Sequence, residues 1–300
     1  MSYTSANQKG MALIQVLIIA IILTMLGIFI NQTIGSQIKT AQLIKSNHHL
    51  DLLLESTEAE LIHALLTQKR YKDRSSLNEW VKSWNFHGEV FHLNDNVSIQ
   101  MQDLNGLLSL NYMSNSVALR LFSQLGFTES DVRIFLDSLK DWKDEDDLKH
   151  LNGAESYYYD KERLPLPRNN FLQSIDEVMN IKGANILTQE QWRKYFSIAL
   201  VSQFNPLNSS PEIIKAFIDN DRAFTQVMSL RSQQRLNTFS FYQATGIEAD
   251  NFITFLTGSI INIKITVTRE SNQLSKSFQV ELRPIANLRP ITISNVKWNE

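Results

Sequence analysis

The 300-residue sequence contains no cysteine, and its charge is almost balanced, with 29 basic and 31 acidic side chains. The absence of cysteine excludes a disulfide framework, a thiolate nucleophile and a zinc–thiolate site. A formal net charge of −2 argues against a general nucleic-acid binder, because such domains usually carry a basic excess. None of the ten glycines forms a glycine-rich phosphate loop. With 43% hydrophobic residues, the chain can still bury a core.

Signatures of catalysis are also scarce. No histidine follows His150, and the sequence has no G-x-S-x-G nucleophile motif. Acid–base chemistry by paired carboxylates would need two of them to converge in a pocket, which sequence spacing does not establish. We therefore expect that the protein is not an enzyme.

One long apolar run lies near the amino terminus. From Met11 to Ile30 only Gln15, Thr24 and Gly27 interrupt it. Twenty residues of helix span about 30 Å, the thickness of a bilayer core. No A-x-A-like cleavage site follows Ile30, which favours a retained membrane helix over a cleaved secretory signal. Lys9 is expected on the cytoplasmic side, with the remainder of the chain outside.

The helix is expected to continue well beyond the membrane. Neither glycine nor proline occurs between Gly35 and Gly88. Four leucines recur at spacings of 4, 7 and 4 residues, which places them on one helix face: Leu50, Leu54, Leu61 and Leu65. The pattern predicts one long helix that is embedded in its first half and packed against a domain in its second.

This amino terminus resembles that of a type IV pilin or pseudopilin. In that family a prepilin peptidase cuts a short basic leader after glycine, and the new amino terminus is methylated. The resemblance implies cleavage between Gly10 and Met11. Most members carry glutamate at mature position five, whereas Gln15 stands there, so charge pairing with the subunit ahead would be lost and a place at the filament tip is indicated. An ordinary signal anchor with a chance Lys9-Gly10 pair is the alternative.

Strand patterns flank a helical block. The alternation from Val97 to Asp103, with a turn at Leu104 to Gly106 and a resumption through Leu108 and Leu110 to Asn111, predicts a β-hairpin with an Asn-Gly turn. Helical patterns then dominate to about Phe241. Apolar residues alternate again in three later stretches: Ile261, Ile263, Ile265 and Val267; Phe278, Val280 and Leu282; and Ile291 and Ile293 with Val296 and Trp298. We expect these strands to complete one sheet against the long helix.

An acidic segment inside the helical block is the most distinctive feature. Seven of the twenty residues from Asp141 to Asp160 are acidic, and they repel one another unless a cation or a base compensates. Such oxygen ligands suit calcium better than zinc or copper. The spacing differs from an EF-hand, because Leu148 and Lys149 occupy the positions of a ligand and of the loop glycine. A solvated acidic loop is the alternative interpretation.

Three separated motifs resemble minor pseudopilin K of the bacterial type II secretion system (the general secretion pathway protein K family). Asp103-Leu-Asn-Gly106 with Leu110-Asn111 resembles its first hairpin, and Pro206 to Glu212 resembles a later segment, with Pro206 departing from the pattern. The acidic segment matches the family pattern in register at nine positions: Asp141, Trp142, Asp144, Asp146, Gly153, Ala154, Glu155, Tyr158 and Tyr159.

The resemblance implies an α+β pseudopilin fold, with a long N-terminal transmembrane helix packed on an antiparallel sheet and a large all-helical insertion domain. We expect a leader at 1–10, a transmembrane helix at 11–30, the periplasmic part of the helix and the first part of the sheet at 31–112, the insertion at 113–241 and the final strands at 242–300. The resemblance also implies bound calcium. Candidate ligands are Asp144, Asp146 and Glu155, with Asp141 and Asp147 in reserve.

The implied function is that of a tip subunit that initiates pseudopilus assembly and supports export of folded proteins across the outer membrane. The implied partners are minor pseudopilins I and J, major pseudopilin G, prepilin peptidase and the inner-membrane assembly platform, and no nucleic acid. The implied location is the inner membrane, single-pass, with the C-terminal domain in the periplasm. Two alternatives stay open. One is a type IV pilus tip minor pilin; the other is a membrane-anchored DNA-uptake receptor, because Ser174 to Gly183 looks like half of a helix-hairpin-helix.

Overall fold

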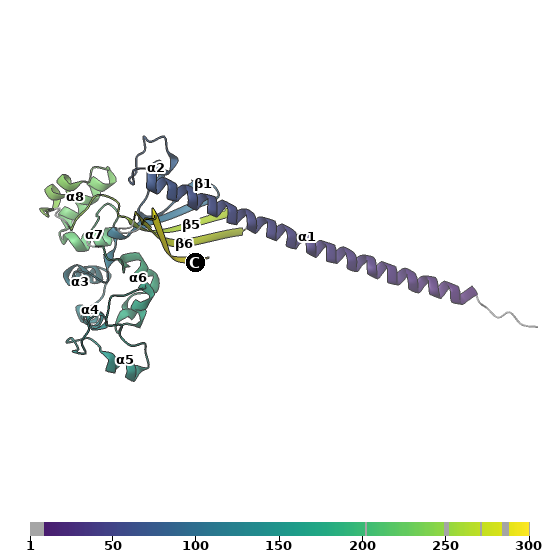
Figure 1. Cartoon of the computed structure of the whole chain (residues 1–300), viewed down its shortest axis with the longest axis horizontal. Helices are drawn as coiled ribbons and strands as arrows, with labels where there is room; N and C mark the ends of the chain where they lie inside the picture. Colours follow the sequence, from purple (N-terminus) through teal and green to yellow (C-terminus); the bar gives the residue numbers. More distant parts are fainter. Residues whose placement is uncertain (1–8, 202, 249–251, 271, 284–287, 300) are drawn as a thin grey trace, which may run out of the picture.

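The computed structural model describes the chain except residues 1–8, 202, 249–251, 271, 284–287 and 300, and except the side chains of residues 9–12. A head made of a sheet and a group of short helices sits at one end of a single long helix (Figure 1).

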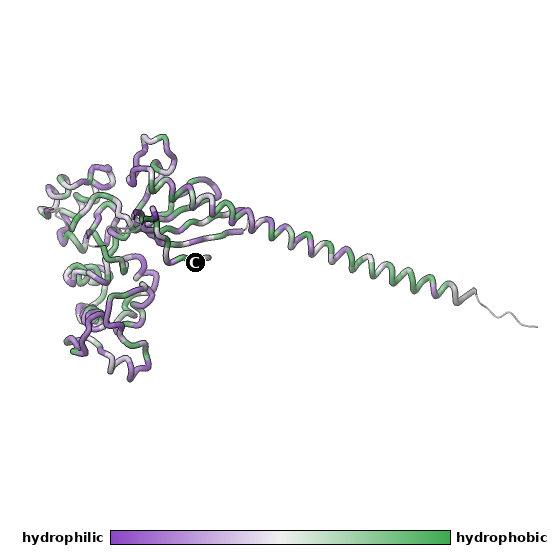
Figure 2. Tube along the Cα trace, in the orientation of Figure 1, coloured by the Kyte–Doolittle hydropathy of each residue, from purple (hydrophilic) through white to green (hydrophobic). Residues whose placement is uncertain are grey.

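The long helix, α1 (Lys9–Thr67), has 59 residues, which corresponds to about 90 Å. Its N-terminal half projects alone from the head and carries most of its hydrophobic residues (Figures 1 and 2). Within the described residues it is the one helix that is long and apolar enough to cross a membrane. The predicted leucine face is confirmed, because Leu50, Leu54, Leu61 and Leu65 are each at most 3% exposed.

A five-stranded antiparallel sheet packs against the C-terminal part of α1, in the order β1-β2-β5-β6-β7. The strands are β1 (His87–Asn94), β2 (Val97–Asp103), β5 (Ile260–Arg269), β6 (Asn272–Leu282) and β7 (Ile291–Trp298). The alternation predicted for β5 and β6 is confirmed: in β5, Ile261, Ile263, Ile265 and Val267 are at most 2% exposed, and the residues between them are less buried. The alternation predicted for β7 is wrong, because Ile293, Val296 and Trp298 are exposed on this edge strand.

The hairpin predicted at the Asn-Gly pair is wrong. Residues Leu104–Gly106 form a short 3-10 turn, η1, in which the backbone N–H of Asn105 donates to the Asp103 carboxylate at 3.0 Å. After this turn β3 (Leu108–Ser109) leaves the main sheet and pairs in parallel with β4 (Phe196–Ser197). Because the Asp103 carboxylate holds the backbone in this 3-10 turn, the chain does not reverse direction and pair with β2.

The hairpin partner of β2 is instead the preceding strand, β1. The two strands are joined at Asn94 to Asn96, where the backbone N–H of Asn96 donates to the side-chain oxygen of Asn94 at 2.9 Å. This is an Asx turn, the local hydrogen bond that makes asparagine a strong turn residue.

The chain between β2 and β5 forms the insertion, which continues beyond one end of the sheet (Figure 1). It runs over residues 104–259, a longer stretch than the expected 113–241, and holds the β3–β4 strand pair as well as helices. A helix outside the insertion, α2 (Glu79–Ser83), packs beside β1. The helices of the insertion are α3 (Asn115–Gln124), α4 (Glu129–Lys143), α5 (Ser156–Glu162), η2 (Ile175–Asn180), η3 (Ala184–Ile186), α6 (Gln189–Tyr195), α7 (Pro211–Ile218), α8 (Asp221–Ser232) and α9 (Thr238–Thr245).

Local caps explain several of these helix starts. The sequence patterns Thr188 to Gln191 and Ser174 to Glu177 each predict a capping box. The first forms at α6, and α7 begins with Ser210 as its cap and Pro211 in its first turn. The second does not form, because Ser174 caps the 3-10 helix η2 by accepting from the N–H of Asp176.

The molecule has two separate apolar cores. One lies between α1, α2 and the sheet and includes Trp84 and Leu54, and the other fills the insertion and includes Phe122 and Trp192. Among the described residues no side chain belongs to both cores. The sheet and the insertion are therefore two packing units on one chain.

Candidate functional site

The acidic segment forms the connection between α4 and α5, and packing fixes both of its ends. Trp142 in the last turn of α4 is 2% exposed, and its ring meets that of Tyr159 in α5 edge-on with centroids 5.1 Å apart. The indole N–H of Trp142 donates to Glu177 at 2.9 Å. Trp142 is therefore a core residue of the insertion.

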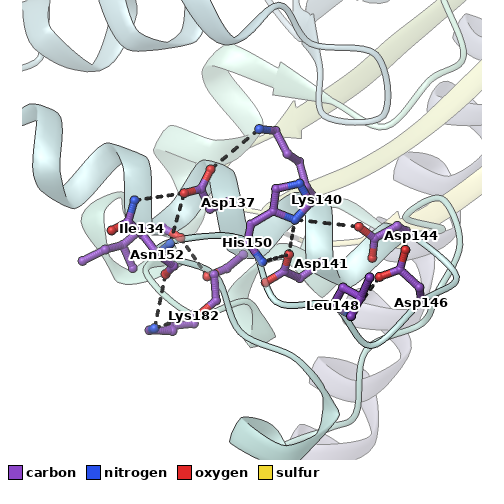
Figure 3. A network of polar contacts seen from close by, with 12 residues as sticks. Ile134, Asp137, Lys140, Asp141, Asp144, Asp146, Leu148, His150, Asn152 and Lys182 are labelled. Atoms are coloured by element: carbon purple, nitrogen blue, oxygen red, sulfur yellow. Dashed lines mark hydrogen bonds and ion pairs between the residues drawn. The ribbon is translucent and has the colours of Figure 1, made fainter.

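Asp141 is fully buried at the start of this loop (Figure 3). Its Oδ1 accepts from the backbone N–H of His150 at 3.0 Å and lies 2.5 Å from the His150 ring Nδ1. Its Oδ2 has no hydrogen-bond partner among the described residues. A Cβ atom on Gly153 would lie 1.9 Å from this oxygen, so only glycine allows the loop backbone to pass so close to the carboxylate.

Glu155 lies at the N-cap of α5 without capping it. The residue is 6% exposed, and in the described part of the chain neither of its carboxylate oxygens has a hydrogen-bond partner. Burial and then the negative charges of Asp141 and Asp144 raise the pKa of Glu155 to about 7. The pKa of Asp144 is raised for the same reasons, burial first and then Asp141 and Asp146. Without a cation, the loop thus holds carboxylates that their surroundings discourage from ionising.

The three predicted ligands come together in space. Asp144, Asp146 and Glu155 each offer an oxygen, and these atoms lie within 4.8 Å of one another. Asp141, held in reserve, forms a second such group with Asp144 and His150. Asp147 belongs to neither group and instead accepts from the Ser156 hydroxyl at 3.4 Å. Sequence reasoning missed His150, because nothing in its spacing from Asp141 indicates that the loop folds back onto α4.

These residues fit a hard divalent cation. Calcium binds oxygen ligands at 2.3–2.6 Å, so oxygens on opposite sides of the ion are up to about 5 Å apart, which matches the spacing of the cluster. The unpaired buried oxygens of Asp141, Asp144 and Glu155 are the stronger test. A buried carboxylate oxygen without a donor is costly, and a cation held by Asp144, Asp146 and Glu155 would offset this cost.

Other contacts hold the loop in shape independently of any ion. Asp137 accepts from the backbone N–H and the side-chain amide of Asn152, at 3.2 and 2.9 Å. The ammonium of Lys182 donates to the carbonyls of Asn152 and Gly153, at 3.3 and 3.1 Å (Figure 3). The cluster is therefore largely preorganised.

The hairpin-like segment that ends in Gly183 supports this loop. Gly183 has φ +85°, and a Cβ there would lie 3.0 Å from the backbone nitrogen of Phe135 in α4. The backbone N–H of Lys182 donates to the Tyr159 hydroxyl at 3.1 Å. The glycine turn that would approach a DNA phosphate in a helix-hairpin-helix is packed against α4 instead.

The predicted processing site lies at the edge of the described chain. The backbones of Gly10 and Met11 belong to the first turns of α1. The Met11 side chain and residues 1–8 lie outside the described part. Gln15 is exposed on the apolar half of α1.

Comparison with known proteins identifies the central segment. Residues 95–200, which include the whole of β2 and the whole acidic loop, match the model of the family described as "Type II secretion system (T2SS), protein K". The predicted resemblance to protein K is confirmed. Together with the structural likeness described next, this match supports a minor pseudopilin of type II secretion. No curated protein sequence matches the chain significantly.

A solved structure agrees with the fold. The chain is similar to one in "The Crystal Structure of the GspK-GspI-GspJ complex from enterotoxigenic Escherichia coli Type 2 Secretion System", with a TM-score of 0.57 and 13% identity over 87% of this chain and 99% of that chain. Because the sequence identity is low, this similarity shows a shared fold only. The predicted pseudopilin fold with a helical insertion is confirmed.

Proposed function

We propose that the chain is the tip subunit of a type II secretion pseudopilus, where it initiates assembly and supports export of folded proteins across the outer membrane. The match of residues 95–200 to the protein K family carries this proposal. The role is one of assembly and requires no catalytic residue in this chain.

In this proposal the N-terminal half of α1 anchors the subunit in the inner membrane, with the head in the periplasm. Prepilin peptidase removes residues 1–10, and the new amino group on Met11 is methylated. The exposed and apolar surface of this half of α1 supports the anchor, because outside lipid it would be left in water.

Two features support a position at the tip. Gln15 is neutral where the family usually carries glutamate, so the subunit does not depend on charge pairing with a subunit ahead of it. The insertion adds bulk beyond the sheet, on the side away from the free half of α1 (Figure 1). A subunit stacked above would collide with it.

The partners proposed are minor pseudopilins I and J, to which the solved GspK-GspI-GspJ complex lends support. Major pseudopilin G would polymerise beneath this complex, and the inner-membrane assembly platform would drive its growth. These partners follow from the family assignment.

Calcium is proposed as the resident cation of the acidic loop. Asp144, Asp146 and Glu155 would hold the ion, with Asp141 beside them. When bound, the ion would neutralise the clustered carboxylates. The chain's own residues position the ligands: Trp142 fixes the end of α4, and Gly153 lets the loop approach Asp141.

Secretion in a bacterium that carries this chain tests the proposal. A strain lacking the chain should accumulate exoproteins in the periplasm, and the wild-type chain should restore export. A Gly10→Leu variant should stay uncut and fail to restore it. Gly27→Ala is the matched control, because Gly27 lies inside the same helix and a Cβ added there would meet no neighbouring atom within 4 Å. Normal export by Gly10→Leu would overturn the assignment.

A further inference from the structure

The junction between the sheet and the insertion is built around one buried carboxylate. The chain leaves the sheet after Asp103, the last residue of β2, and returns at β5, where Asp103 pairs with Ile261. Asp103 is fully buried. It therefore lies where the outgoing and returning strands of the insertion meet.

Four donors from three chain segments converge on this carboxylate. Oδ1 accepts from the backbone N–H of Asn105 at 3.0 Å. Oδ2 accepts from the side-chain amides of Asn205 and Asn208, at 3.1 and 2.7 Å, and from the backbone N–H of Gly258 at 3.2 Å. The two asparagines lie about a hundred residues away in the sequence, so they bring the middle of the insertion to the end of β2.

Close backbone contacts surround these bonds. A Cβ on Gly106 would lie 2.1 Å from the carbonyl oxygen of Asn208, and one on Gly258 would lie 2.7 Å from Asp103 Oδ1. The backbone N–H of Asn205 also donates to the carbonyl of Asn105 at 2.8 Å. Both glycines are thus required by the close approach of the segments around the carboxylate.

The loop after α1 joins the same junction. The guanidinium of Arg70 donates to the carbonyl of Gly258 at 3.2 Å, and the Thr257 hydroxyl donates to the carbonyl of Arg70 at 2.7 Å. The positive charge of Arg70 also lies close enough to the negative charge of Asp103 for the two to attract each other. The end of α1 is therefore connected to the junction through the strand that returns to the sheet.

Apolar packing does not span this boundary, since the two cores share no side chain among the described residues. Lys297 of β7 and Asp176 of η2 form another connection between the two units, at 3.4 Å, but both side chains are more than a third exposed, and exposed pairs contribute little. Directional hydrogen bonds to a buried charged group are stronger than bonds between neutral groups.

We infer that Asp103 is an interdomain latch, whose carboxylate fixes the orientation of the insertion relative to the sheet and α1. Asn205 and Asn208 are the residues of the insertion whose side-chain amides donate to this carboxylate. Loss of the carboxylate would leave each unit folded on its own core but free to reorient. The inference rests on this junction alone and does not depend on the proposed secretion role.

Distance measurement between two spin labels tests the latch in the full detergent-solubilised chain, and the absence of native cysteine makes specific labelling direct. One pair, at Gln226 of α8 and Thr292 of β7, spans the boundary. A second pair, at Asn115 of α3 and Gln226, stays within the insertion. All three side chains are exposed.

The variant Asp103→Asn should shift and broaden the interdomain distance distribution while leaving the distribution within the insertion unchanged. Asp95→Asn, at an exposed turn of the sheet, is the control and should change neither. Asn208→Ala, which keeps the carboxylate but removes one donor, should give a smaller broadening. It also provides the test if Asp103→Asn does not fold.

Two results would overturn the latch. An interdomain distribution that stays as narrow as in the wild type in folded Asp103→Asn, or in Asn208→Ala if the first variant does not fold, would mean that other contacts fix the orientation. Equal broadening of both label pairs would mean that the carboxylate maintains the insertion's own fold.

Discussion

At the scale of single residues, Glu155 and Asp141 set the behaviour of the acidic loop. Both are almost completely buried, and their carboxylates retain oxygens that accept no hydrogen bond from any residue that the structure describes. A bound cation would turn this unfavourable arrangement into a stable one, because the same oxygens would become ligands. Occupancy of the loop and stability of the insertion should therefore rise together.

Calcium should raise the melting temperature of the wild-type chain, and excess chelator should lower it. An ion at a hundred times its dissociation constant adds about 2.7 kcal/mol, which is several degrees for a domain of this size. Glu155→Gln should abolish the response in a thermal unfolding experiment. Asp160→Asn, an exposed acidic residue of the same segment, should retain it. A wild-type melting curve that is the same in calcium and in chelator would refute the calcium proposal.

The raised pKa of Glu155 predicts a specific dependence on pH in the metal-free chain. Its pKa of about 7, against an ordinary value of 4.5, means that the folded state binds the proton more tightly than the unfolded state does. The contribution of Glu155 to stability should therefore be fully present below pH 4.5 and be lost as pH rises through 7. The loss is at most about 3.5 kcal/mol, since one pKa unit corresponds to about 1.4 kcal/mol.

Urea unfolding in chelator at pH 5.5 and pH 8 measures this effect. The wild-type chain should lose more stability between the two pH values than Glu155→Gln, whose side chain does not titrate. An equal loss in both proteins would show that other groups are responsible.

At the scale of elements, α1 has two different surfaces along one helix. Its N-terminal half is apolar on all sides and exposed, whereas its C-terminal part buries one row of leucines against the sheet. A partly buried ion pair between Glu58 of α1 and Lys276 of β6, at 2.5 Å, adds a polar contact to this interface. The packed part should therefore carry the stability of the sheet unit.

Leu54→Ala should destabilise the sheet unit by about 2–5 kcal/mol, because Leu54 is fully buried and its loss leaves a cavity. Leu52→Ala, two residues away and 50% exposed, should change stability by less than about 0.5 kcal/mol. Urea unfolding of the detergent-solubilised chain, followed by tryptophan fluorescence, gives both values. Equal effects of the two substitutions would contradict the packing of α1 described here.

Elements governed by periodic burial could be predicted from sequence, and those governed by distant partners could not. The leucine row of α1 and the alternating isoleucines of β5 face one core, so their spacing reports their structure directly. The Asn-Gly pair at 105–106 does not form the predicted hairpin turn, for two reasons. The Asp103 carboxylate accepts a hydrogen bond from Asn105, and the backbone of Asn208, far along the chain, packs against Gly106. No local pattern carries that information.

The same limit applied to the candidate site. Asp144, Asp146 and Glu155 could be selected from the family pattern, and the structure brings them together. The family pattern could not show that Asp147 lies outside the cluster and His150 inside it, because the fold of the loop decides which side chains point inward. His150 joins the cluster through its contact with Asp141 across a turn of the loop.

At the scale of the whole molecule, the chain combines a membrane-length helix, a sheet and an insertion whose cores are separate. Because the cores are separate, α1 and the sheet keep the arrangement of the pseudopilin fold while the insertion adds a separate surface. The proposed tip position uses both parts: α1 would join the other subunits, and the insertion would end the filament.

The intact mass of the membrane-extracted protein tests the central claim most directly. If the chain is a processed pseudopilin, its mass should equal that of residues 11–300 plus one methyl group, and fragmentation should place the methyl group on the amino terminus of Met11. A mass that still includes residues 1–10 would contradict the account.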